Sequence, residues 1–152
     1  MTDLDRTPQS TPPETVVAAS IRAWIGHSSR HWLPVSGHSM WPFLRDGDRV
    51  LVQCGRDNLR RGDVLVFQVN GRLVIHRLID IHQTLTAQRF VTCGDNVRRA
   101  DAPVHVNQIV GPVIAVERGE RVFKLTRLHW HLLGRSLAWL QRLFLKLRRR
   151  LE

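Results

Sequence analysis

Short hydrophobic runs separated by turn residues dominate the middle of the chain, and this pattern predicts β-strands. The runs are rich in Val, Ile, Leu and Phe and occupy residues 49–53, 63–69, 73–81, 88–92 and 109–116. Asn70-Gly71, a dipeptide favoured in two-residue hairpins, separates the second run from the third. Five or more strands with short connections favour an all-β barrel or sandwich over a parallel α/β sheet.

The two ends of the chain follow other patterns. Residues 1–13 are polar and proline-rich, so we expect them to be disordered. Residues 14–26 carry apolar side chains at helical spacing, and the leucines of residues 121–152 do the same. The sequence therefore predicts one domain at 14–120 with a leading helix, followed by an amphipathic helix at 121–152.

Positive charge is concentrated in this last segment. Residues 121–152 contain nine Lys or Arg against one acid, which accounts for eight of the net charge of +10. Leucines and tryptophans beside so many cations are typical of a helix that lies on an anionic membrane surface, which makes such a surface a possible partner. Two alternatives are packing of the leucines on the β-domain and a contact with protein or nucleic acid, although nucleic acid is not the expected partner.

No stretch of the chain has the composition of a transmembrane helix. The apolar run at 16–25 is short and contains Arg22, and the run at 128–147 contains Arg135, Arg142 and Lys146. The N-terminus also lacks the apolar core of a cleavable secretion signal. We therefore expect a cytoplasmic protein or one held peripherally at a membrane surface.

Residues 36–52 carry the most distinctive chemistry. A Ser-Met pair, a proline and a Gly-Asp turn lead directly into an apolar strand, which places Ser39 at the lip of the sheet. A serine hydroxyl at this position is a candidate nucleophile, but it needs a base within hydrogen-bond reach. His76, in an otherwise apolar strand, is the candidate base.

An acid that accepts the second imidazole N–H would complete the set, because it fixes the tautomer of the base. Asp95 in a Gly-Asp-Asn turn and Asp101, six residues further on, are both candidates. The residues by themselves leave this choice open.

The segments 35–52, 62–79 and 92–101 resemble the three sequence boxes of type I signal peptidases, in the serine-peptidase group (S24/S26) that also contains the SOS-repressor autoproteases. The resemblance implies a signal peptidase-like β-barrel catalytic domain with Ser39 as nucleophile and His76 as base. Most bacterial members have a lysine in place of His76, so the chain is similar to the serine–histidine subtype of endoplasmic reticulum and archaeal signal peptidases. In that subtype Asp101 would be the acid partner, and Asp95 a structural or assisting carboxylate.

The resemblance further implies that Gly37, Met40 and Pro42 line the substrate site. The expected function is that of a serine endopeptidase that removes signal or leader peptides from precursors through a Ser39–His76 acyl-enzyme. The substrate would add as a strand to the sheet edge.

Two other functions remain possible on the sequence. One is a non-catalytic binding module whose basic tail binds an anionic membrane or nucleic acid. The other is a self-cleaving repressor-type protease, but its Ala-Gly or Cys-Gly cleavage site should precede the serine, whereas Cys54-Gly55 and Cys93-Gly94 follow it. No cofactor or metal is expected, because the eight histidines and two cysteines lack zinc-ligand order and no phosphate-binding fingerprint occurs.

Overall fold

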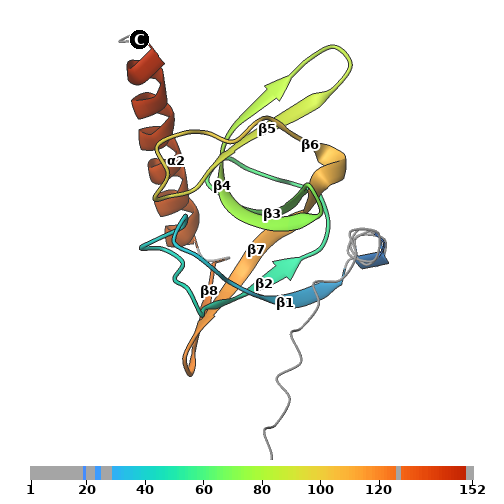
Figure 1. The fold of residues 1–152 in the computed structure, drawn as a ribbon, viewed down its shortest axis with the longest axis vertical. Helices are drawn as coiled ribbons and strands as arrows, with labels where there is room; N and C mark the ends of the chain where they lie inside the picture. The colour runs from blue at the N-terminus through green and yellow to red at the C-terminus, as the bar shows by residue number, and fades with distance from the viewer. Residues whose placement is uncertain (1–18, 20–22, 25–28, 126–127, 150–152) are drawn as a thin grey trace, which may run out of the picture.

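The computed structural model describes residues 19, 23–24, 29–125 and 128–149, which form a mainly β fold followed by one long helix (Figure 1). The elements are β1 (Arg30–Pro34), β2 (Arg49–Gln53), β3 (Val64–Val69), β4 (Arg72–Gln83), β5 (Gln88–Cys93), β6 (Val104–His105), the 3-10 helix η1 (Val106–Gln108), β7 (Ile109–Arg118), β8 (Arg121–Lys124) and α2 (Leu128–Arg149). The predicted fold class, mainly β, is confirmed. The disorder predicted at 1–13 and most of the helix predicted at 14–26 lie outside the described residues.

The strands form an antiparallel sheet in the order β1-β2-β7-β3-β4-β5-β6, and β8 pairs with β7. Three of the pairings contain a register shift, at Leu51/Val52, Val66/Phe67 and Leu78/Asp80. Such irregularities bend strands and increase their twist, which is why the sheet curls strongly in Figure 1. The expected barrel-like β domain is therefore a curled sheet that stays open among the described strands, because β1 and β6 stand at the two ends of the order.

All five strands predicted from the hydrophobic pattern are present, with ends that differ by at most two residues. The turn between β3 and β4 is the predicted two-residue hairpin, with φ of 48° at Asn70 and 73° at Gly71. Positive φ at both positions is the requirement of the hairpin turn that Asn-Gly favours. These features depend on neighbouring residues alone, so the sequence suffices to predict them.

Strands β1, β6 and β8 were not predicted, because few of their side chains are buried and they lack a hydrophobic signal. In β8 all four side chains are exposed, and the strand is held by backbone pairing with β7. The predicted amphipathic helix at 121–152 is therefore wrong at its start: residues 121–124 are extended, and α2 begins at Leu128.

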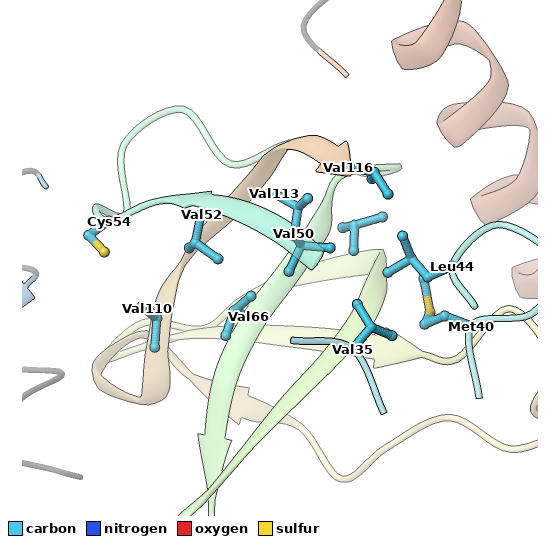
Figure 2. Packing of buried hydrophobic residues seen from close by; sticks show 11 residues of the cluster. Val35, Met40, Leu44, Val50, Val52, Cys54, Val66, Val110, Val113 and Val116 are labelled. Atoms are coloured by element: carbon cyan, nitrogen blue, oxygen red, sulfur yellow. The ribbon is translucent and has the colours of Figure 1, made fainter. Parts of the chain in front are cut away.

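The largest hydrophobic cluster lies where β2, β3 and β7 meet, and it also anchors the loop that connects β1 to β2. Figure 2 shows the valines of these three strands facing one another, with Met40 and Leu44 of the loop beside Val50 and Val35. Met40 is 3% exposed and Leu44 is fully buried. The loop that carries Ser39 is therefore fixed to the core on the C-terminal side of the serine.

Helix α2 packs on the sheet mainly through small and polar residues. The backbones of Gly62 and Gly134 touch, since a Cβ on Gly134 would lie 2.5 Å from the Gly62 carbonyl oxygen. Ala138, one turn further on, is buried, and Arg142 Nε lies 3.0 Å from Asp80 Oδ2 on β4. Glycine and alanine at the contact let the helix approach the sheet closely.

Most large apolar side chains of α2 point away from the sheet, whereas Leu145 packs against the cluster of Ile79, Cys93 and Ala138. Six of the outward-pointing side chains are 40–62% exposed: Leu133, Trp139, Leu140, Leu143, Phe144 and Leu147. The alternative in which the leucines pack on the β-domain is therefore wrong for Leu140, Leu143 and Leu147, whereas Leu125 and Leu145 are partly buried against the β-domain. Among the described residues, no helix is long and apolar enough to cross a membrane.

An ion pair between a buried carboxylate and a partly exposed arginine connects the start of β2 to the end of β7. The guanidinium of Arg118 donates to both carboxylate oxygens of Asp48, at 2.6 and 2.9 Å, and the backbone N–H of Arg45 donates to the same carboxylate at 2.9 Å. Burial alone would raise the pKa of Asp48, but these hydrogen bonds and the two arginine charges outweigh it and lower the pKa. The lowered pKa stabilises the folded protein. This contribution is fully present above the unfolded-state pKa of about 3.9, and it is lost as the pH falls through the folded-state pKa.

Replacing Arg118 by methionine is therefore expected to destabilise the protein by about 3 kcal/mol at pH 7, because the Asp48 carboxylate stays buried without its cation. At about pH 2, where the carboxyl is protonated in the unfolded chain, the difference from wild type should shrink. Urea unfolding at the two pH values measures both quantities. Arg121→Met, on the exposed strand β8, is the control, and an equal loss at both pH values for Arg118→Met would contradict the linkage.

Candidate active site

Ser39 lies in the loop 35–48, whose ends are tied together. The backbone N–H of Val35 donates to the carbonyl oxygen of Asp48 at 2.8 Å, so the loop leaves and re-enters the sheet at one point. Met40, the next residue, is buried in the core described above. Ser39 is half-buried between the hydrogen-bonded base of the loop and the buried side chain of Met40. These two anchors limit the positions that the serine hydroxyl can take.

Three side chains that are distant in sequence form one line of hydrogen bonds. His76 Nε2 lies 3.1 Å from Ser39 Oγ, and His76 Nδ1 lies 2.7 Å from Asp101 Oδ2. The buried hydroxyl of Thr92 donates to the same Asp101 oxygen at 2.7 Å. If Nδ1–H donates to the carboxylate, Nε2 is free to accept the proton of the serine hydroxyl.

Asp95 does not contact His76, and it forms a bidentate ion pair with Arg77 instead. Arg77 Nε and Nη2 lie 2.8 and 2.7 Å from the two carboxylate oxygens, and both side chains are at most 7% exposed. Arg77 Nη1 also donates to the Gly62 carbonyl oxygen at 2.8 Å, and its guanidinium stacks over Phe43. Of the two candidate acids, Asp101 therefore contacts the histidine, whereas Asp95 lies in a buried ion pair beside the site.

The turn after β5 clamps the serine loop from the other side. The backbone N–H of Asn96 donates to the Ser39 carbonyl oxygen at 2.8 Å, and Gln141 of α2 donates to the Gly94 carbonyl oxygen at 3.1 Å. A Cβ on Gly94 would lie 2.6 Å from the Ser39 carbonyl oxygen and 3.1 Å from His76 Nε2. Only glycine leaves room here for the serine and the histidine together.

A pocket of about 320 Å³ opens beside Ser39. Its lining residues are Leu33, Pro34, Val35, Ser36, Gly37, Ser39, Met40, Leu73, Val74 and Ile75. Of the three predicted substrate residues, Gly37 and Met40 belong to this lining, whereas Pro42 is exposed and lies outside it. Gly37 adopts a φ of +84°, and its N–H donates to Asp46 Oδ1 at 2.8 Å.

The pocket lies between two strand edges. Among the described strands, β1 pairs with β2 alone, and residues 73–75 of β4 pair with β3 alone, because the pairing of β4 with β5 starts at Arg77. Both strands therefore present backbone N–H and C=O groups toward the pocket side. An extended peptide can pair with such edges.

Neither cysteine is suited to act as a nucleophile. Burial, and next the carboxylates of Asp101 and Asp95, raise the pKa of the Cys93 thiol to about 11. Burial also raises the pKa of the Cys54 thiol, and both residues are free thiols in the interior. In the described part of the chain, no group of three or more His, Cys, Asp or Glu side chains is arranged to hold a metal ion.

Sequence reasoning missed three residues that build this site: Arg77, Thr92 and Gly94. The sequence contained a signal for Arg77, because an arginine in a hydrophobic strand needs a carboxylate partner when it is buried, and Asp95 was a candidate partner. Thr92 and Gly94 gave no comparable signal, since their roles depend on what the fold brings against them.

A serine, a histidine and an aspartate that form one hydrogen-bonded line are the catalytic arrangement of serine hydrolases, a class that includes the serine peptidases. The chain belongs to the peptidase S24-like family, whose model matches residues 9–88, more than half of the 152 residues. The match includes Ser39 and His76 and ends before Asp95 and Asp101. No curated protein matches the chain.

Proposed function

We propose that this protein is a serine endopeptidase that cleaves signal or leader peptides from precursors, with Ser39 as nucleophile, His76 as general base and Asp101 as the residue that orients the base. The observation that carries the proposal is the continuous line from Asp101 Oδ2 through the His76 ring to Ser39 Oγ, with links of 2.7 and 3.1 Å. The His76–Asp101 pair corresponds to the serine–histidine subtype, in which no buried lysine is needed.

In this mechanism, Ser39 Oγ attacks the scissile carbonyl carbon while His76 Nε2 takes the hydroxyl proton. The C–N bond then breaks, and the imidazolium passes its proton to the leaving amine, so that an acyl ester on Ser39 remains. Water, deprotonated by the same nitrogen, hydrolyses the ester. The backbone N–H of Ser39 is the candidate donor to the oxyanion, a contact commonly worth about 3 kcal/mol in the transition state.

The pocket beside Ser39 supports a small apolar residue before the cleaved bond. Its volume of about 320 Å³ is lined mostly by aliphatic side chains and by Gly37. A substrate strand between β1 and β4 would pair with both free edges and would extend the open sheet. The resemblance to signal peptidases points to the same substrate class.

Self-cleavage at a Cys-Gly bond has less support. Cys93 is buried at the end of β5, and the Gly94 carbonyl oxygen accepts a hydrogen bond from Gln141. Attack on this bond would first require the turn that clamps Ser39 to come apart. Cleavage of a separate polypeptide needs no such rearrangement.

The test is to incubate the purified protein with a library of leader-like peptides and to identify products by mass spectrometry, with and without a serine-reactive fluorophosphonate. We expect cleavage after small apolar residues, and inhibition in proportion to labelling of Ser39. Cleavage that continues after Ser39 is fully labelled would refute the assignment. A chain that shortens itself during the incubation would favour the repressor-type function.

We further propose that the peptidase works at an anionic membrane surface through α2. The exposed apolar face of this helix has the side chains to enter the acyl layer, and Arg135, Arg142 and Lys146 lie along its length. An amphipathic helix with large apolar residues on one side and cations beside them is typical of interfacial binding. Docking of the opposite face on the sheet leaves the apolar face available.

Co-sedimentation with phosphatidylglycerol–phosphatidylcholine vesicles measures this association. The triple variant Leu140→Gln/Leu143→Gln/Leu147→Gln should bind at least about 10-fold more weakly, because each buried leucine side chain contributes about 1.5–3 kcal/mol. Leu85→Gln, at the exposed turn between β4 and β5, is the control and should bind as wild type does. Equal binding by the triple variant would exclude α2 as the contact.

A further inference from the structure

A second, larger hollow adjoins the candidate active site. It has a volume of about 1100 Å³ and lies between β4, β5, the loop 98–103 and α2. Its lining residues are Ile79, Asp80, His82, Thr84, Arg89, Val91, Arg98, Arg99, Ala100, Asp101, Ala102, Pro103, Arg142, Leu145 and Lys146. We call this hollow the basic cleft. Its lining shares Asp101 with the catalytic line and Arg142 and Lys146 with α2, but neither proposed function places a ligand in the hollow itself.

The basic cleft carries an excess of positive charge. Five Arg or Lys side chains line it against two aspartates, and both aspartates already have partners. Asp80 pairs with Arg61 at 2.7 Å and with Arg142 at 3.0 Å, and Asp101 accepts hydrogen bonds from His76 and Thr92.

The cations Arg98, Arg99 and Lys146 are exposed and have no carboxylate partner among the described residues. They come from two elements: the two arginines from the loop after β5, and the lysine from α2. Several unpaired cations around one hollow favour an anionic ligand, and two neighbouring arginines can each hold a carboxylate in a bidentate fashion.

Asp101 connects the basic cleft to the catalytic line. It lines the cleft, and its Oδ2 lies 2.7 Å from His76 Nδ1, so one imidazole ring separates the cleft from Ser39. In the proposed mechanism the leaving amine takes its proton from His76, so the C-terminal half of the substrate departs past the histidine. An extended chain advances about 3.4 Å per residue, which brings the cleft within a few residues of the cleaved bond.

We propose that the basic cleft binds an acidic segment of the polypeptide substrate, located within a few residues on the C-terminal side of the cleaved bond. This inference rests on the proposed peptidase function and adds a specificity element to it. A peptide fits better than a nucleic acid, because Asp80 and Asp101 within the lining oppose a continuous phosphate backbone but tolerate separately spaced carboxylates. In addition, binding of the substrate at Ser39 would place the segment after the cleaved bond next to the cleft.

The first experiment measures binding without cleavage, by fluorescence anisotropy with the Ser39→Ala protein. The probe is a fluorescein-labelled hexaglutamate peptide, compared with hexaglutamine. We expect salt-sensitive binding of hexaglutamate alone, weakened at least about 10-fold by Arg98→Glu/Arg99→Glu. The matched control Arg121→Glu/Lys124→Glu changes the net charge equally on β8, which contributes no residue to the lining of the cleft, and should change the Kd by less than about 2-fold.

The second experiment uses a peptide that the wild-type protein cuts, with three Glu or three Gln placed either before or after the cleaved bond. Glu after the bond should lower KM about 10-fold relative to Gln, and Arg98→Glu/Arg99→Glu should remove this preference with little change in kcat. A preference for Glu before the bond, or none, would overturn the inference and leave the peptidase proposal intact.

Three further results would also overturn the inference. Binding of hexaglutamate that Arg98→Glu/Arg99→Glu leaves unchanged would place the acidic ligand elsewhere. Tighter binding of a labelled hexathymidylate or of phosphatidylglycerol vesicles through the same arginines would assign the cleft to phosphates. Failure of the wild-type protein to cut any peptide, with hexaglutamate still bound at the arginines, would refute the peptidase function and with it the assignment of the cleft to a substrate.

Discussion

Ser39→Ala and His76→Ala are each expected to lower kcat for peptide cleavage by about 10⁶-fold, and the double variant by no more than either single one. The reason is that the hydroxyl and the imidazole, 3.1 Å apart, act as one unit in the attack. Steady-state kinetics with a peptide from the library screen measures the three values. Thermal melting followed by circular dichroism establishes that each variant is folded.

Asp101→Asn should have a smaller effect, about 10⁴-fold on kcat, because the amide can turn its NH₂ toward the histidine and stabilise the wrong tautomer. Asp95→Asn distinguishes the two aspartates, since Asp95 pairs with Arg77 and does not reach the base. His38→Gln, an exposed histidine beside Ser39, is the control and should retain the wild-type kcat.

Two results would contradict this arrangement. If Asp95→Asn lowered kcat of the folded protein more than Asp101→Asn did, Asp95 would be the orienting acid. If the Ser39→Ala and His76→Ala effects multiplied in the double variant, the two residues would not work together.

The largest effect on stability is expected from Arg77→Met, which should lower the free energy of unfolding by about 3–5 kcal/mol. The Asp95 carboxylate is 7% exposed and would lose both N–H donors, at 2.7 and 2.8 Å. The variant would also lose the hydrogen bond to the Gly62 carbonyl oxygen, next to the contact between Gly62 and Gly134 of α2. Urea unfolding at pH 7 gives the value.

The double variant Arg77→Met/Asp95→Leu should be more stable than Arg77→Met, since it removes the unpaired carboxylate as well. Arg72→Met is the matched control on the same strand, because Arg72 is exposed and its loss should cost at most about 0.5 kcal/mol. An Arg77→Met variant as stable as the control would contradict the prediction, because water or a shifted loop would then supply hydrogen bonds to the Asp95 carboxylate.

The residues in both predictions show which parts of the candidate site can be inferred from the sequence. The Ser-Met pair before a Gly-Asp turn indicated Ser39 as a candidate nucleophile. The histidine in an apolar strand became the candidate base because such a serine needs one. The residues by themselves left the choice between Asp95 and Asp101 open because both lie in one short polar loop, and the family resemblance implied Asp101. In the fold, Arg77 forms an ion pair with Asp95, and Thr92 donates a hydrogen bond to Asp101. These contacts place Asp101, and not Asp95, against the histidine.

Helix α2 gives the opposite lesson. The leucines at helical spacing drew attention to the apolar face, yet the helix packs through Gly134 and Ala138. Close approach of the backbone at Gly62 and the pairing of Arg142 with Asp80 decide which face turns inward. Neither contact is visible from the helix alone, because each needs a partner more than 60 residues away in the chain.

The sequence by itself determined the mainly β fold, its five core strands and the Asn70-Gly71 hairpin, and it indicated Ser39 and His76 as candidates. Hydrophobic alternation, turn conformations and side-chain chemistry produce these features over a few neighbouring residues. Only the tertiary structure decided that the sheet stays open, that Ser39 and Asp101 meet the histidine, that α2 exposes most of its leucines and that distant cations surround one cleft. Each of these outcomes depends on which distant side chains are buried together, and local pattern carries no information on that.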